Sequence, residues 1–255
     1  MISIKTSAEI EKMVVSGRVL AEILQAVQAR VRPGVSTREL DQLAYRLCMD
    51  RKVKPAFKGY HGFPYSLCVS VNEEVVHGFP SERRLAEGDI VSLDFGVYRD
   101  GYFSDAALTL AVGAVSPQAS ALIRVTREAL FAGLARVKAG NRLGDVSAAV
   151  QERVEAGGYS VVRHFVGHGI GRALHEDPQI PNFGEPGRGP VLKAGMVLAV
   201  EPMVNAGGFE VEILSDGWTA VTKDRSLSAH FEHTVAVTEN GCRILSQPDS
   251  DHPLF

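Results

Sequence analysis

Three histidines and three glycines stand within the fifteen residues HFVGHGIGRALHEDP, from position 164 to position 178. Imidazole side chains bind metal ions and move protons near neutral pH, whereas glycine lets the backbone approach another group closely. Gly167 and Gly169 flank His168, so this part of the chain can come very near a bound ligand. The combination predicts a site where backbone, imidazole and a small ligand meet.

Two aspartates stand in neighbouring segments that have the pattern of β-strands. In DIVSLDFGVY, residues 89–98, the alternation of side chains places Asp94 on the face opposite the apolar residues. The chain returns as YFSDAALTL, residues 102–110, which carries Asp105. Both aspartates are expected on one face, where like charges repel. A shared proton or a bound cation would remove that conflict.

The turn between these segments decides the register, and two registers are open. If residues 99–100 centre the turn, Asp105 lies directly opposite Asp94. If residues 100–101 centre it, Asp105 lies opposite Gly96 and diagonal to Asp94.

Two glutamates also stand in segments that have the pattern of β-strands. Glu201 is the one carboxylate in the apolar segment MVLAVEPMV, residues 196–204, and Glu232 begins the strand-like part of HFEHTVAVT, residues 230–238. Any one of the four carboxylates could instead face solvent at a strand end. Together with a histidine, however, they form a ligand set for divalent ions such as Mn, Fe, Co or Zn: Asp94, Asp105, His168, Glu201 and Glu232.

The size of this set predicts two ions. Five ligands with four negative charges exceed what one catalytic zinc uses. They suit two ions about 3.5–4 Å apart that are bridged by carboxylates.

The remaining histidines divide into two groups. His77 and His175 lie outside the ligand set and are suited to proton transfer or to hydrogen bonds with a substrate. For His164 and His233 a surface imidazole without a role is the open alternative, and His61 is intermediate.

Local signals predict four helices. TSAE at residues 6–9 and STRE at residues 36–39 have the form of capping boxes ahead of apolar residues at helical spacing. Ser116 followed by Pro117 opens a third helix that should run to about Val137. A fourth helix is expected from Leu143 to Ala156. Further strands are expected at residues 66–72, 160–169, 196–204, 209–214, 219–222, 230–238 and 243–245.

The two halves of the chain resemble each other. VRPG at residues 31–34 corresponds to VKAG at 137–140, and LAEGDIVSLD at 85–94 corresponds to LKAGMVLAVE at 192–201. The second match aligns Asp94 with Glu201. We therefore expect one domain over residues 1–255, built from two similar halves, about 1–113 and 114–240, with the site between them.

Composition excludes several classes of protein. A net charge of −3 gives no basic field, so neither nucleic acid nor an acidic membrane is indicated as a partner. Three cysteines without CxxC spacing argue against a disulfide framework and against a zinc–thiolate site. No signal peptide or membrane-spanning run is recognisable, so a cytoplasmic location is expected.

The chain resembles the type I methionine aminopeptidases, in the bacterial form without a zinc-finger extension. The resemblance runs over nearly the whole chain, in the motifs GYHGFPYSLCVSVNEEVVHG, LDFG with DGYFSD, FVGHGIGRALHEDPQIPN, VLAVEP and HFEHTVAV. It implies an α/β (α+β) "pita-bread" fold, in which an antiparallel sheet is flanked by two pairs of helices with pseudo-twofold symmetry. It also implies removal of the initiator methionine from new proteins when the second residue is small, by a water that two ions (Co, Mn, Fe or Zn) activate to attack the first peptide bond.

The resemblance assigns roles position by position. The metal ligands are matched by Asp94, Asp105, His168, Glu201 and Glu232, of which Asp105 and Glu232 match the bridging pair. Glu201 also matches the general base, while His77 and His175 match the histidines that contact the scissile amide. The pocket for the methionine side chain is matched by Tyr60, His61, Phe63, Cys68, Leu174 and Trp218.

Three positions depart from the family pattern. Phe57 stands where bacterial relatives often have cysteine and is expected to narrow the rim of the pocket. Leu174 replaces a more usual aromatic residue, and His230 stands where glutamine is commoner. These departures bear on substrate preference and rate.

Two alternatives remain at this stage. An aminopeptidase P or prolidase has a similar ligand set but usually carries an additional N-terminal domain. A non-catalytic peptide-binding module on the same fold typically lacks some of the ligands. The expected partners are the N-termini of nascent polypeptides, with a transient contact to the ribosome, and the chain is expected to be a monomer.

Overall fold

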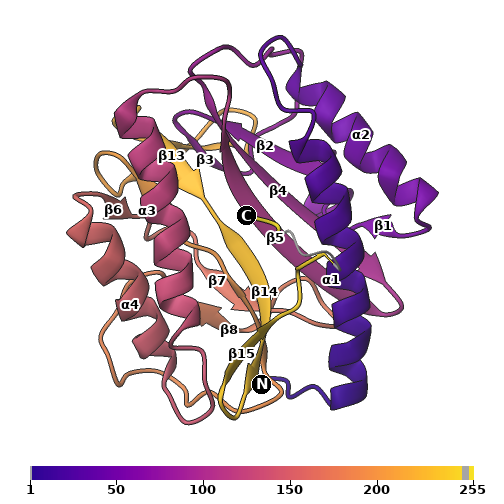
Figure 1. Cartoon of the computed structure of the whole chain (residues 1–255), viewed down its shortest axis with the longest axis vertical. Coiled ribbons are helices and arrows are strands. Elements are labelled where there is room, and N and C mark those ends of the chain that lie inside the picture. Colours follow the sequence, from indigo (N-terminus) through magenta and orange to yellow (C-terminus); the bar gives the residue numbers. More distant parts are fainter. Residues whose placement is uncertain (1, 249–252) are drawn as a thin grey trace.

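A computed structural model describes residues 2–248 and 253–255. The described part contains two pairs of helices that lie in front of a large sheet, one pair on each side of β14 (Figure 1). These helices are α1 (Ser7–Gln28), α2 (Thr37–Asp50), α3 (Pro117–Leu134) and α4 (Leu143–Ala156).

The helices begin where the sequence signals predict. Thr6 with Glu9, and Ser36 with Glu39, form reciprocal capping boxes that satisfy free backbone N–H groups. Ser116 caps α3 ahead of Pro117. The end of α3 differs from the prediction: the helix stops at Leu134, not at Val137, because the chain tightens into turns in which Val137 N–H donates to the carbonyl of Leu134.

A nine-stranded sheet forms the centre of the molecule, and its strands pair in the order β1-β4-β5-β14-β9-β7-β8, with β2 on β4 and β15 on β14. All of the pairings are antiparallel. The strands are β1 (Lys54–Pro55), β2 (Leu67–Val71), β4 (Ile90–Arg99), β5 (Tyr102–Ala111), β7 (Gly167–Gly169), β8 (Glu176–Ile180), β9 (Val197–Val200), β14 (Glu232–Thr238) and β15 (Gly241–Ile244).

Two small sheets complete the fold. One has the order β13-β10-β6 and the other β11-β12-β3. Their strands are β3 (Glu74–Val76), β6 (Ser160–Val161), β10 (Met203–Asn205), β11 (Val211–Ile213), β12 (Ala220–Thr222) and β13 (Ser228–His230), and a short 3₁₀ turn, η1, spans Tyr60–Gly62.

Three segments that were predicted as single strands are broken. Residues 160–169 form β6 and β7 with bends between them, residues 196–204 are divided at Glu201 and Pro202, and residues 230–238 are divided at Phe231. Proline has no backbone N–H for a ladder. At Glu201 and Pro202 the chain passes from the large sheet to a small one, and at Phe231 it passes from that small sheet back to the large one. Period-two patterns do not reveal such a change of sheet.

The main core lies between the large sheet and the helices. Val91, Leu93 and Phe95 face it from β4, as their alternation predicts, and Leu20 and Leu24 face it from α1. Asp94 and its neighbours on the opposite face are thereby directed away from the helices.

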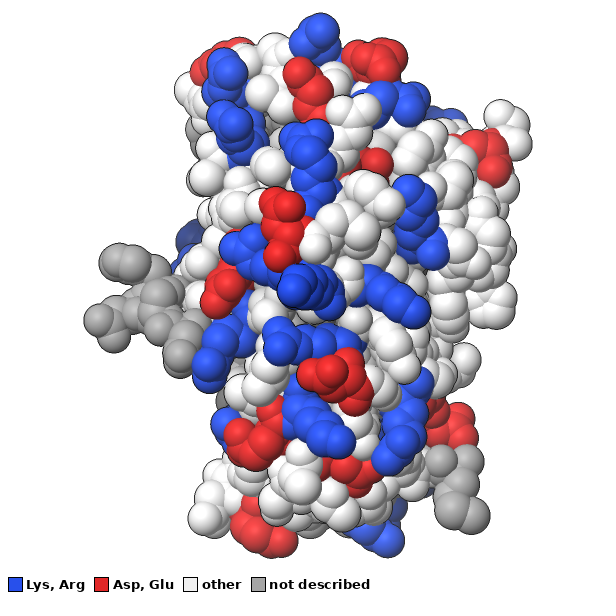
Figure 2. Space-filling model, turned by 90° about the vertical axis from the view of Figure 1, so that its right-hand side faces the viewer, with Lys and Arg blue, Asp and Glu red and all other residues white. Residues whose placement is uncertain are grey.

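Charge is distributed unevenly over the surface. Residues 29–58 contain eight lysines and arginines but three acidic residues, whereas the whole chain carries a net charge of −3. Figure 2 shows many lysine and arginine side chains on the side of the molecule formed by α1 and α2, with acidic side chains among them. Among the described residues, no helix combines the length and apolar character needed to cross a membrane.

Candidate metal centre and its cavity

One cavity of about 210 Å³ brings together the residues that the sequence singled out. All five predicted ligands, the two histidines His77 and His175, and the six predicted pocket residues line it. The full lining is Phe57, Tyr60, His61, Phe63, Cys68, His77, Asp94, Asp105, His168, Leu174, His175, Glu201, Trp218 and Glu232.

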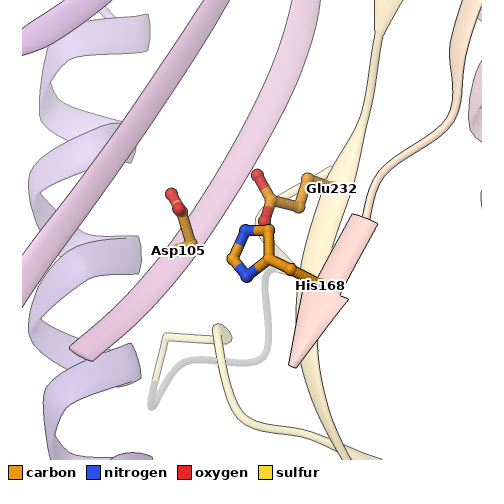
Figure 3. Close-up of side chains that lie close together, drawn as sticks. All are labelled: Asp105, His168 and Glu232. Carbon is orange, nitrogen blue, oxygen red and sulfur yellow. The ribbon is translucent and has the colours of Figure 1, made fainter. Parts of the chain in front are cut away.

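Three side chains in this cavity are close enough to share an ion. Figure 3 shows Asp105, His168 and Glu232 pointing toward one another from β5, β7 and β14. One ligand atom from each lies within 4.8 Å of the others. Residues far apart in the sequence thus form a compact oxygen and nitrogen ligand group.

The β4–β5 hairpin places a third carboxylate, that of Asp94, beside this group. Gly96 pairs with Asp105 and Arg99 with Tyr102, so residues 100–101 centre the turn and Asp105 is diagonal to Asp94. The carboxyl groups of Asp94 and Asp105 share a hydrogen bond. This contact is the shared-proton arrangement that reduces repulsion between adjacent carboxylates.

The two glutamates stand where strands change sheet. Glu201 follows β9 directly, and Glu232 begins β14 one residue after β13 ends. Glu201 Oε1 lies 3.5 Å from His168 Nε2. The breaks in these strands therefore direct both carboxylates into the cavity rather than along a regular ladder.

Burial works against negative charge on all four carboxyl groups. It raises the pKa of Asp94 to about 7, partly offset by the hydrogen bond with Asp105. Burial, followed by the charges of neighbouring carboxylates, also raises the pKa of Asp105, Glu201 and Glu232. One oxygen each of Asp94, Asp105 and Glu232 is buried without a hydrogen-bond partner among the described residues. Divalent cations would satisfy these oxygens and favour the charged form, so the residues fit a metal centre.

The imidazole of His168 has the tautomer and the neutral state that a metal ligand needs. Its Nδ1 lies 2.9 Å from the carbonyl oxygen of Gly169, which can only accept. Nδ1 therefore carries the hydrogen, and Nε2 offers a lone pair on the side of Glu201. Burial, followed by the charge of His175, lowers the pKa of His168 to about 3, so the ring is neutral at pH 7.

The glycines beside His168 also allow close packing of the backbone, in addition to the predicted approach to a ligand. A Cβ at Gly167 would lie 2.4 Å from the carbonyl oxygen of Ala199, and one at Gly169 would lie 2.1 Å from that of Asp177. Glycine is required here because β7 packs closely between the backbones of β9 and β8. These glycines therefore affect the placement of His168, and a Cβ at Gly167 would also lie 3.4 Å from Glu201 Cγ.

Aromatic rings form the apolar part of the cavity. Phe63 and Trp218 meet edge to face with their ring centroids 5.2 Å apart, and the ring of His77 lies 6.2 Å from that of Trp218. Burial, followed by the charge of His175, lowers the pKa of His77 to about 4. Burial, followed by the charge of His61, lowers the pKa of His175 as well.

Two features of the site go beyond the sequence analysis. His230 is 1% exposed, and its Nε2 lies 3.7 Å from Glu201 Oε2, opposite the side that His168 approaches. The sequence flagged His230 only as a departure from a family pattern. His233 is not a surface imidazole: it is fully buried, and its ring stacks on Phe255 at 4.4 Å. The pattern of apolar neighbours in β14 could have indicated this burial.

The fold and the ligand group define the class of protein. Metallopeptidase family M24 matches residues 11–239, and the chain belongs to this family. A prolidase from Pyrococcus furiosus has the same fold, with a TM-score of 0.79 and 25% identity, over 97% of this chain and 66% of that one.

Closer similarities identify the group within the class. A methionine aminopeptidase from Clostridium perfringens is 54% identical over 246 residues, which cover 96% of this chain and 99% of that protein. The crystal structure of a methionine aminopeptidase from Thermotoga maritima matches with a TM-score of 0.95 and 52% identity, over 96% of this chain and 99% of that one. The chain belongs with the methionine aminopeptidases, and the predicted pita-bread fold is confirmed.

Proposed function

We propose that this chain removes the N-terminal methionine from newly made proteins whose second residue is small. The observation that carries the proposal is the cavity itself, in which a buried group of carboxylates and imidazoles adjoins an aromatic and apolar wall. The names of the two relatives from Clostridium perfringens and Thermotoga maritima, both methionine aminopeptidases, support the same reaction.

The proposed cofactors are two divalent ions, drawn from Co, Mn, Fe and Zn. The residues that would hold them are Asp94, Asp105, His168, Glu201 and Glu232. When bound, such ions supply positive charge that lowers the pKa of an attacking water and polarises a carbonyl group.

The chain's own residues would complete the reaction. Glu201 accepts the proton of the water that attacks the first peptide bond. His77 and His175 donate hydrogen bonds to the scissile amide as negative charge develops on its oxygen. The free α-amine of the substrate lies near Asp94, which restricts cleavage to the first residue.

The apolar wall would select methionine. Phe63, Cys68, Leu174 and Trp218 provide a soft, polarisable lining that suits a thioether. Phe57 also lines the cavity, where its ring would narrow the rim. Crowding beyond the scissile bond would favour a small second residue.

The two alternative functions, a prolidase-like enzyme and a non-catalytic peptide-binding module, have less support. The chain spans 66% of the Pyrococcus prolidase at 25% identity but 99% of the Thermotoga aminopeptidase at 52%. A non-catalytic module would have no need of four buried carboxylates whose ionisation the protein opposes.

We further propose that the partners are nascent N-termini in the cytoplasm, that the chain acts as a monomer and that it contacts the ribosome transiently. The excess of basic over acidic residues within residues 29–58 supports contact with an anionic particle. This local excess of lysine and arginine is not apparent from the net charge of −3 of the whole chain.

The test is the release of free methionine from Met-Ala-Ser and from a peptide that begins Met-Pro. Metal-stripped protein is assayed with Mn, Co, Fe or Zn added, beside the Glu201→Gln variant. We expect metal-dependent release from Met-Ala-Ser that falls about 10²- to 10⁴-fold in the variant. No release with any metal from folded protein would favour a binding module, and cleavage only before proline would favour a prolidase-like enzyme.

A further inference from the structure

The hydroxyl of Tyr60 contacts one of the proposed catalytic histidines. Tyr60 Oη lies 2.7 Å from His175 Nδ1, and the two ring centroids are 5.2 Å apart. The family resemblance implies for Tyr60 only a place in the wall of the methionine pocket. A polar bond to His175 gives this tyrosine a connection to the chemistry that a wall residue does not need.

The backbone holds Tyr60 in place for this contact. Gly59 has a φ of +88° and donates its N–H to the carbonyl of Phe63 at 2.7 Å, while Phe63 N–H donates to the carbonyl of Tyr60 at 2.9 Å. These bonds close the turn on both sides of the tyrosine. Its side chain therefore leaves a rigid turn rather than a free loop.

The contact between Tyr60 Oη and His175 Nδ1 can form in two ways, because each group can donate or accept. If Tyr60 donates to a bare Nδ1, both atoms are satisfied within the protein. In the reverse arrangement, the phenolic hydrogen has no acceptor among the described residues and has to bond solvent.

The neighbouring imidazole, that of His168, also has a hydrogen-bond partner at Nδ1, but this partner favours the other tautomer. The rings of His168 and His175 meet edge to face at 4.3 Å. Nδ1 of His168 faces a carbonyl oxygen, which can only accept, so its Nε2 is a bare lone pair. Nδ1 of His175 faces a hydroxyl group, which can donate, so its Nε2 can carry a hydrogen. The hydrogen-bond partner of Nδ1 thus decides whether Nε2 of each ring presents a lone pair or an N–H group to the cavity.

We propose that Tyr60 is a positioning residue whose hydroxyl donates to Nδ1 of His175 and thereby holds the imidazole in the tautomer that carries its hydrogen on Nε2. This N–H, on the far side of the ring from Tyr60, is then free to donate to the carbonyl oxygen of the scissile bond. In the other tautomer Nε2 would present a lone pair to an oxygen that is gaining negative charge, which is repulsive. The inference rests on the proposed function, because it concerns the same reaction.

The experiment compares Tyr60→Phe with wild type and with Tyr65→Phe. Phenylalanine at position 60 keeps the ring and removes only the hydroxyl. Tyr65 is a matched control: its ring packs on Phe63 and Phe79, and its hydroxyl makes no hydrogen bond to the described residues. Two quantities are measured: kcat and KM for Met-Ala-Ser with metal-loaded enzyme, and the ¹⁵N chemical shifts of the His175 ring in metal-free protein.

We expect wild type to show a protonated Nε2 and a bare Nδ1, and Tyr60→Phe to show a mixture of tautomers. The kcat of Tyr60→Phe should fall about 10- to 100-fold, the range typical for losing the outer partner of a functional histidine, with little change in KM. Tyr65→Phe should match wild type in both measurements.

Three results would overturn the inference: an Nδ1–H tautomer in wild type, an unchanged kcat in Tyr60→Phe, or a rise in KM alone. If wild type itself released no methionine, the proposed function would fail. The ring shifts of His175 would still decide whether Tyr60 sets the tautomer.

Discussion

At the scale of single residues, the metal-free fold disfavours the negative charge of the four carboxyl groups in the site. Asp94, Asp105, Glu201 and Glu232 all have raised pKa values because they are buried together. The metal-free folded state therefore holds protons that the unfolded chain loses at about pH 4. A bound cation would replace these protons, so metal binding and proton release should be linked.

The stability of metal-free protein should consequently fall as pH rises above about 6.5. A carboxyl group with a raised folded pKa destabilises the fold as pH rises toward that value, which is about 7 for Asp94. His77 and His168, with pKa values of about 4 and 3, act in the opposite direction, but only below their unfolded value of about 6.5. Denaturant unfolding of chelator-treated protein should show a loss of about 1.4 kcal/mol per pH unit for each proton released.

The Asp105→Asn variant is the control for this effect. Removing one charge from the group should make the metal-free protein at least as stable as wild type above pH 7. Added Mn should stabilise wild type, by about 2.7 kcal/mol at a hundredfold excess over Kd, but not the variant. A wild-type stability that stays constant between about pH 6.5 and 8.5 would contradict this account.

At the scale of elements, the sequence predicted what local chemistry decides. The starts of α1 and α2 follow from capping boxes that involve residues three positions apart. Alternation in β4 predicted the face of Asp94, and the hairpin turn left two registers of which the structure has one. The breaks at Pro202 and Phe231 were not predicted, because they arise when one chain serves two sheets. The contacts of His230 and Tyr60 were missed because they join segments distant in the sequence.

The close packing of β7 gives a prediction at this scale. In Gly169→Ala the new methyl group would meet backbone atoms of Asp177 and Glu176, which cannot turn aside as a side chain can. Such overpacking typically costs about 1–3 kcal/mol, and it should displace His168 from the ligand group. We therefore expect lower stability and a smaller thermal shift on adding Mn, both measured by calorimetry.

The control for this prediction is Gly133→Ala, which is also crowded but lies far along α3. Its methyl group would meet the side chain of Val150 at 2.7 Å. Alanine in a helix interior regains about 1 kcal/mol relative to glycine, so the net change in stability should be small. The Mn-dependent shift should be intact. Equal loss of that shift in both variants would mean that β7 packing has no special link to the site.

At the scale of the whole molecule, the two predicted halves are joined by the pairing of β3 with β12 in a small sheet. In the large sheet they meet along a short seam between β5 and β14. Backbone pairing there is confined to Glu232 with Ala107 and His233 with Ala106. On one side of this pair, Thr234 Oγ1 accepts from the N–H of Asp105 at 3.0 Å and donates to its carbonyl at 2.8 Å.

On the other side of the seam, Thr109 Oγ1 bonds the N–H and the carbonyl of His230 in the same way, at 2.8 and 2.9 Å. Each predicted half thus contributes one threonine whose hydroxyl bonds the N–H and the carbonyl of a residue in the other half, as a neighbouring strand would. Asp105 and His230, which the threonines hold, both belong to the site or touch it.

Replacing Thr234 with valine should therefore weaken both the seam and the metal centre. Valine keeps the shape but leaves the N–H and the carbonyl of buried Asp105 unpaired, at about 1–3 kcal/mol for each group. Thr126→Val is the matched control, because Thr126 is equally buried and its hydroxyl bonds only the carbonyl of Leu122 within α3. Denaturant unfolding with and without Mn should show a larger loss for Thr234→Val and a reduced stabilisation by the ion, whereas Thr126→Val keeps the full effect of Mn. If the two variants lost equal stability and responded equally to Mn, the threonine bonds would not be what joins the seam to the site.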